Sequence, residues 1–70
     1  MIKKRSVDIA GHKTSVSLEA PFWDALTAIA QQRNISINQL IAEIDKERTS
    51  NLSSALRVHV LKDVQARIPT

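Results

Sequence analysis

A chain of 70 residues without cysteine can hold one small domain, and it can form neither a disulfide nor a cysteine-based zinc site. So short a chain buries little surface, and we expect it to gain stability from a second copy of itself. Its two histidines lack ligand spacing, it has one glycine, and no stretch approaches the ~20 apolar residues of a membrane span. We therefore expect no metal, no cofactor, no small-molecule substrate, no membrane contact, no enzyme activity and a cytoplasmic location.

The positive charge is concentrated near the amino end. The net charge is +3, with an isoelectric point of about 9.8. Residues 1–18 contain one acidic side chain, Asp8, and four basic ones, which are Lys3, Lys4, Arg5 and Lys13. Residues 19–70 hold equal numbers of basic and acidic side chains. Such a distribution suits a polyanionic partner, because neutralising phosphates releases counterions; a solubilising tail is the alternative.

The first regular pattern lies between residues 13 and 18. One set of alternate side chains is Thr14, Val16 and Leu18, and the other is Lys13, Ser15 and Ser17. This period of two predicts a strand with one buried face. A lone strand cannot satisfy its own backbone hydrogen bonds, so it needs a partner. That partner is either the weaker alternation at residues 6–9 or the same strand of another copy.

The period then changes to that of a helix. Pro21 suits a first helical turn, and apolar residues recur at helical spacing after it. We predict a helix over residues 21–33, ended by Asn34 in the left-handed conformation. Trp23 lies on this helix, and we expect it to lie in the core or at the rim of a dimer; stacking on a nucleotide is the alternative.

Two more helices follow. Ser36 and Gln39 have the spacing of a capping box, which predicts a helix over residues 36–47. Asn51 can cap a third helix that extends to residue 68. The predicted order is therefore strand, helix, helix, helix.

The strand and the second helix offer the chemistry of a DNA-binding surface. If the apolar set of the strand faces the helices, then Lys13, Ser15 and Ser17 project to the other side. Two such strands paired antiparallel form a ribbon that fits the major groove, where Lys and Ser can bond to base edges. The capped helix start, Ser36 to Asn38, has free N–H groups that suit a phosphate. An ordinary solvated strand face and a purely structural cap are the alternatives.

Three segments resemble the ribbon-helix-helix repressors: Lys13-Thr-Ser-Val-Ser-Leu-Glu, Ala-Gln-Gln-Arg-Asn34, and Ile35-Ser36-Ile37-Asn38-Gln39-Leu40-Ile41. The likeness covers roughly residues 12–47. The whole chain looks like a short bacterial subfamily, with which it shares Arg-Ser-Val…Ala-Gly-His at 5–12, Phe-Trp-Asp-Ala-Leu at 22–26 and Asn-Leu-Ser-Ser-Ala-Leu-Arg at 51–57. Shorter family members lack the helix from residue 51 onward.

The resemblance implies a mainly α fold in which one N-terminal strand pairs across a homodimer and three helices follow. Residues 1–12 would be a basic arm, and residues 13–70 a ribbon-helix-helix domain with an extra helix at 51–68. The ribbon would enter the major groove of double-stranded DNA. The residues that would read bases are Lys13, Ser15 and Ser17, and those that would bind phosphates are Lys3, Lys4, Arg5, Ser36, Ile37 and Asn38.

We therefore expect a sequence-specific DNA-binding homodimer that acts as a transcriptional regulator or repressor. The extra helix could also mediate the association of dimers into higher oligomers. One alternative is an antitoxin whose third helix neutralises a partner protein. Another is a dimeric protein-interaction module whose ribbon never meets DNA, which the lightly charged, Ser-rich strand would permit.

Overall fold

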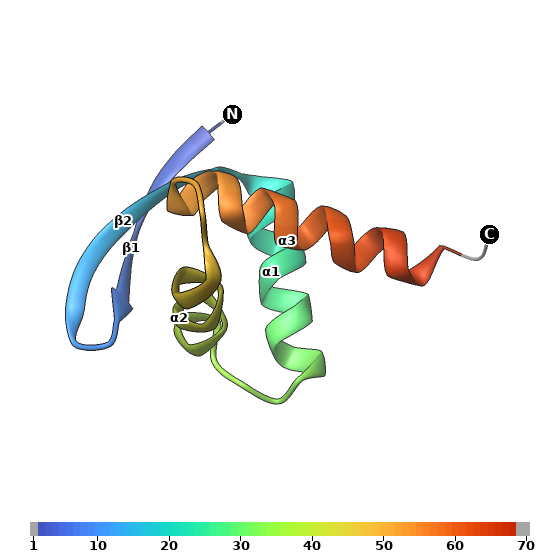
Figure 1. The fold of residues 1–70 in the computed structure, drawn as a ribbon, viewed down its shortest axis with the longest axis horizontal. Helices are drawn as coiled ribbons and strands as arrows, with labels where there is room; N and C mark the ends of the chain where they lie inside the picture. Colours follow the sequence, from blue (N-terminus) through green and yellow to red (C-terminus); the bar gives the residue numbers. More distant parts are fainter. Residues whose placement is uncertain (1, 69–70) are drawn as a thin grey trace.

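The computed structural model describes residues 2–68 as an antiparallel hairpin followed by three helices (Figure 1). The elements are β1 (Ile2–Ile9), β2 (His12–Glu19), α1 (Ala20–Gln32), α2 (Ile37–Glu47) and α3 (Leu52–Arg67). The mainly helical fold, the strand at 13–18 and all three helices agree with the prediction from the sequence. Residue 1 of the expected arm and residues 69 and 70 of the expected domain lie outside the described residues.

The hairpin contains one strand more than the predicted fold. β2 pairs antiparallel with β1 of its own chain, in a register that opposes Ile9 to His12 and Ile2 to Glu19. Residues 2–9, for which an arm was expected, thus form a strand longer than the weak pattern at 6–9. The apolar alternation of β1 is interrupted, because two of its four helix-facing residues are basic. Val7 and Ile9 are buried on that face, but Lys3 and Arg5 lie on the same face.

A two-residue turn closes the hairpin. Ala10 has φ 51° and Gly11 has φ 83°, so both adopt left-handed conformations, which match the twist of a hairpin. Ala10 is strained there, because left-handed backbone brings its Cβ close to the following carbonyl oxygen. Asparagine tolerates this conformation better than alanine.

We expect Ala10→Asn to raise the free energy of unfolding by about 0.5–1 kcal/mol, because it relieves this strain. Urea denaturation followed by circular dichroism measures the change. The matched substitution, Gly11→Ala, should lower stability by about 1 kcal/mol; no atom lies within 4 Å of the added Cβ, so the cost is backbone strain. Equal effects of both substitutions would contradict the turn geometry.

The helix ends carry the predicted caps. Asn34 has φ 61°, and the N–H groups of Asn34 and Ile35 donate to Gln31 O and Ala30 O, which together close α1 as a Schellman motif. Ser36 Oγ accepts from the N–H of Gln39 at 3.0 Å. Asn51 caps α3 in the same way, through the N–H of Ser54 at 2.9 Å.

One core joins the inner face of the hairpin to all three helices. Its fully buried members, each 0% exposed, are Leu18, Leu26, Leu40, Ile41 and Leu56. α2 packs against β1, while the amino end of α3 packs against β2. The carboxyl half of α3 extends away from the hairpin (Figure 1), and Leu61 and Val64 in it are 54% and 45% exposed.

Candidate nucleic-acid interface

The three residues predicted to read bases share one exposed face of the hairpin. Val16 and Leu18 point into the core and are 1% and 0% exposed, so Lys13, Ser15 and Ser17 project from the opposite side of β2. All three are exposed. The structure therefore brings them together on a surface that no helix covers.

Helix α3 holds the outer edge of β2 at one end. The N–H of Ser17 donates to Ser53 Oγ at 3.2 Å, and Ser17 O accepts from Arg57 Nη2 at 3.2 Å. The backbone groups of Ser17 therefore point away from β1. By the alternation of an antiparallel ladder, those of Lys13 and Ser15 point to the same edge, and no residue of the described chain occupies that part of it.

An ion pair reinforces this contact. Arg57 Nε donates to Glu19 Oε1 at 3.0 Å. The pKa of the Glu19 carboxyl group is lowered by a hydrogen bond from its own backbone and next by the bond from Arg57. Glu19 therefore stays ionised at neutral pH, and acid weakens the contact as it protonates the carboxylate.

The basic residues of β1 are divided between the two faces of the hairpin. Lys3 and Arg5 oppose Leu18 and Val16, on the side of the helices. The Arg5 guanidinium lies 4.7 Å from the centre of the Trp23 ring, a cation–π distance. Lys4 opposes Ser17 instead and lies on the outer face.

The predicted phosphate clamp is the start of α2. Ser36 and Asn38 are exposed, and Ile37 is half-buried against the core. Ser36 Oγ accepts the N–H of Gln39, and the N–H groups of Ile37 and Asn38 have no hydrogen-bond partner among the described residues. This end of the helix can accept an anion.

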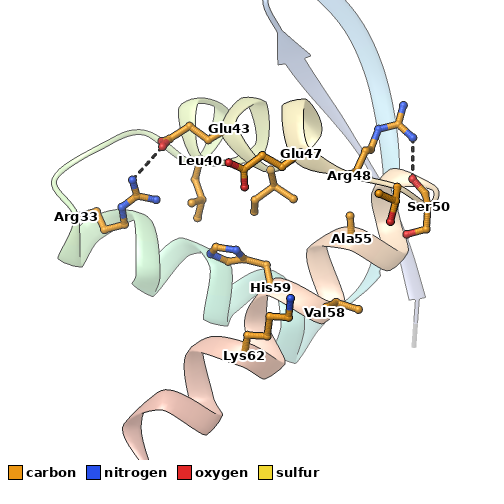
Figure 2. A pocket seen from close by; sticks show the side chains of 12 residues that line it. Arg33, Leu40, Glu43, Glu47, Arg48, Ser50, Ala55, Val58, His59 and Lys62 are labelled. Atoms are coloured by element: carbon orange, nitrogen blue, oxygen red, sulfur yellow. Dashed lines mark hydrogen bonds and ion pairs between the residues drawn. The ribbon is translucent and has the colours of Figure 1, made fainter.

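A separate cavity of about 340 Å³ lies between α2 and α3 (Figure 2). His59, Glu47 and Lys62 face it, and an ion pair between Arg33 and Glu43, 3.0 Å long, lies at its rim. None of its lining residues belongs to the hairpin or to the start of α2. The cavity is therefore distinct from the candidate DNA surface.

The sequence did not predict that α3 contacts strand β2. Ser53 and Arg57 belong to the Asn-Leu-Ser-Ser-Ala-Leu-Arg segment at 51–57. This segment is shared with the bacterial subfamily, but the sequence assigned no function to its residues. Nothing in the helical period of residues 52–68 indicates that their side chains reach Ser17, because that contact links residues 36 and 40 positions apart.

A β-ribbon with basic and hydroxyl side chains on its outer face, followed by helices, defines a class of small DNA-binding modules. Residues 2–64 match the model of the ribbon-helix-helix domain, and the chain belongs to that family. Its domains are typically non-enzymatic DNA-binding or regulatory modules. No curated protein sequence matches this chain.

The chain is also similar to a solved structure, that of an uncharacterized protein from Bordetella pertussis Tohama I. The TM-score is 0.77 and the sequence identity 32%. The match covers 100% of this chain but only 64% of the length of that one.

Two other kinds of feature are absent from residues 2–68. Within this range no helix is long and apolar enough to cross a membrane. Nor do its His, Asp and Glu side chains gather into a group of three that could hold a metal ion.

Proposed function

We propose that this protein is a sequence-specific DNA-binding homodimer that represses transcription in the bacterial cytoplasm. The observation that carries the proposal is the exposed outer face of β2, on which Lys13, Ser15 and Ser17 project side by side away from the core. Lysine donates to guanine O6 and N7 in the major groove, and serine can donate to or accept from a base. The small serine side chains let the backbone approach the bases closely.

The start of α2 supplies the second contact. Its free N–H groups and the positive pole of the helix would hold a phosphate beside the groove at Ser36, Ile37 and Asn38. Such contacts position a protein on the duplex without reading sequence. In this proposal the paired β2 strands recognise the base sequence, and α2 fixes the position of the protein along the duplex.

The free edge of β2 supports the pairing of two protomers. The backbone groups of Lys13 and Ser15 point outward, and a second β2 strand can bond to them antiparallel. The result would be a four-stranded sheet with both β2 strands at its centre. A stable dimer also suits a chain whose fold is as small as this one.

Selection of bound duplexes from a random pool, run beside a measurement of mass in solution, tests the proposal. We expect a two-fold symmetric or repeated motif and a mass of two or more chains. Affinity should fall steeply with salt, by about 0.9 in log K per unit of log salt for each phosphate neutralised. A folded protein that binds no duplex at low salt would overturn the DNA-binding function.

Lys13→Ala should weaken binding to the selected duplex by about fivefold or more, because one base contact per protomer is lost. Fluorescence anisotropy measures the Kd, and circular dichroism checks that the fold is intact. Lys62→Ala, on α3, removes the same charge outside the hairpin and should leave the Kd nearly unchanged. If Lys13→Ala binds as tightly as the wild type, Lys13 does not read bases.

One observation favours a second function, the binding of another protein. A shallow groove of about 300 Å³ between Phe22 of α1 and the side of α3 is lined mainly by apolar side chains, among them Leu61 and Val64. If the protein is an antitoxin, this groove would bind the toxin; if it is an interaction module, the groove would bind another partner protein. The groove would otherwise join two dimers into a tetramer. A small protein that co-purifies at a fixed ratio, or a mass of four chains, would support these readings.

A further inference from the structure

The outer face of the hairpin is two strands wide, because β1 contributes to it as fully as β2. In the register of the pair, Lys4 opposes Ser17, Ser6 opposes Ser15, and Asp8 opposes Lys13. Directly opposed residues of an antiparallel pair project to the same side. The β1 members of this face, Lys4, Ser6 and Asp8, are all exposed.

Only one member of the basic run at residues 3–5 joins this face. Lys3 and Arg5 oppose residues that are buried in the core, and Arg5 packs over Trp23. The Nε atom of Arg5 is itself buried. Lys4 is therefore directed toward any ligand of the outer face, whereas its two basic neighbours are directed away from it.

The spacing of strands indicates what Lys4 would meet. Neighbouring strands lie about 4.8 Å apart, so with two β2 strands about the two-fold axis each β1 lies roughly 7 Å from that axis. The major groove is about 12 Å wide, so its wall begins at roughly 6 Å from the middle. The β2 strands then cover the base edges, and the β1 strands lie against the sugar-phosphate walls.

We propose that Lys4 binds a DNA phosphate at the wall of the major groove, with Ser6 beside it, and that Lys3 does not contact DNA. The inference rests on the proposed function and refines it, because it divides a basic run into one residue that binds DNA and two that lie on the opposite, helix-facing side of the hairpin. Asp8, at the turn end of the face, opposes Lys13 and limits the positive charge there.

The test compares Lys4→Ala with Lys3→Ala, adjacent substitutions that remove the same charge. Both are titrated, beside the wild type, against the duplex selected from the random pool at several salt concentrations. Lys4→Ala should weaken binding roughly five- to tenfold at about 0.1 M salt and reduce the salt slope by about 0.9 for each phosphate lost. Lys3→Ala should leave the slope unchanged, and Lys4→Arg should restore binding.

Equal losses in Lys3→Ala and Lys4→Ala would overturn the inference, since they would indicate a diffuse charge effect, and so would a Lys4→Ala protein that binds like the wild type. Either result leaves the proposed function standing, because the wild type still binds. A wild type that binds no duplex would instead remove the proposed function itself. Unfolding curves of all variants should coincide, because both lysines are exposed.

Discussion

Leu56→Ala is expected to lower the free energy of unfolding by about 2–5 kcal/mol. Leu56 is 0% exposed and holds α3 against the shared core, so truncation leaves a cavity that the neighbours fill only in part. Small domains have total stabilities of about 5–15 kcal/mol, so the loss is a large fraction of the whole. Urea denaturation at several protein concentrations measures it.

Leu61→Ala is the matched control, because it makes the same change further along α3. Leu61 is 54% exposed, so its truncation should cost at most about 0.5 kcal/mol in an isolated chain. A larger cost that grows with protein concentration would mean that another molecule covers this face. If Leu56→Ala costs no more than Leu61→Ala, α3 does not pack as described.

Ser15→Pro should abolish pairing between protomers while it preserves the hairpin. The N–H of Ser15 points to the outer edge of β2 and not to β1, so proline removes a bond to the second copy only. We expect a folded monomer by sedimentation, and affinity for the selected duplex lower by roughly a hundredfold or more, because a monomer meets only half of the site.

The control for this experiment is Ser15→Ala, which retains the backbone N–H. It should stay dimeric and lose only the contact of the hydroxyl group. A Ser15→Pro protein that remains a dimer would show that the protomers meet elsewhere, and the apolar face of α3 would then be the next surface to alter. An unfolded Ser15→Pro protein would mean either that the N–H of Ser15 bonds within the hairpin or that the protomer does not fold without its partner.

The helices and caps could be predicted because their signals are local. Ser36, Asn34 and Asn51 determine helix ends through contacts within a few residues, and all three occupy the predicted positions. The apolar alternation of β2 was equally clear, and the exposure of Lys13 follows from it directly. These features depend on the chain next to them and on little else.

The second strand and the role of α3 could not be predicted in the same way. β1 places the long side chain of Arg5 on the inner face, where its stem and charge cover Trp23, so the strand lacks a simple apolar alternation. Its turn is Ala-Gly, a weaker signal than Asn-Gly. The contacts of Ser53 and Arg57 with Ser17 depend on how α3 crosses the end of the hairpin, which no local pattern encodes.

Because α3 is hydrogen-bonded to the backbone N–H and C=O of Ser17, it also restricts how the β2 strands of two protomers can align. A symmetric pair that keeps these bonds, and in which both Lys13 and Ser15 bond to the other copy, opposes Lys13 to Ser15 and places the two Thr14 residues on the axis. The two Lys13 residues would then be about 7 Å apart along the strands, whereas a pair centred on Ser15 would separate them by about 14 Å. At about 3.4 Å per base pair, the bonds of α3 to Ser17 would thus decide whether the two Lys13 residues span about two base-pair steps of the operator or about four.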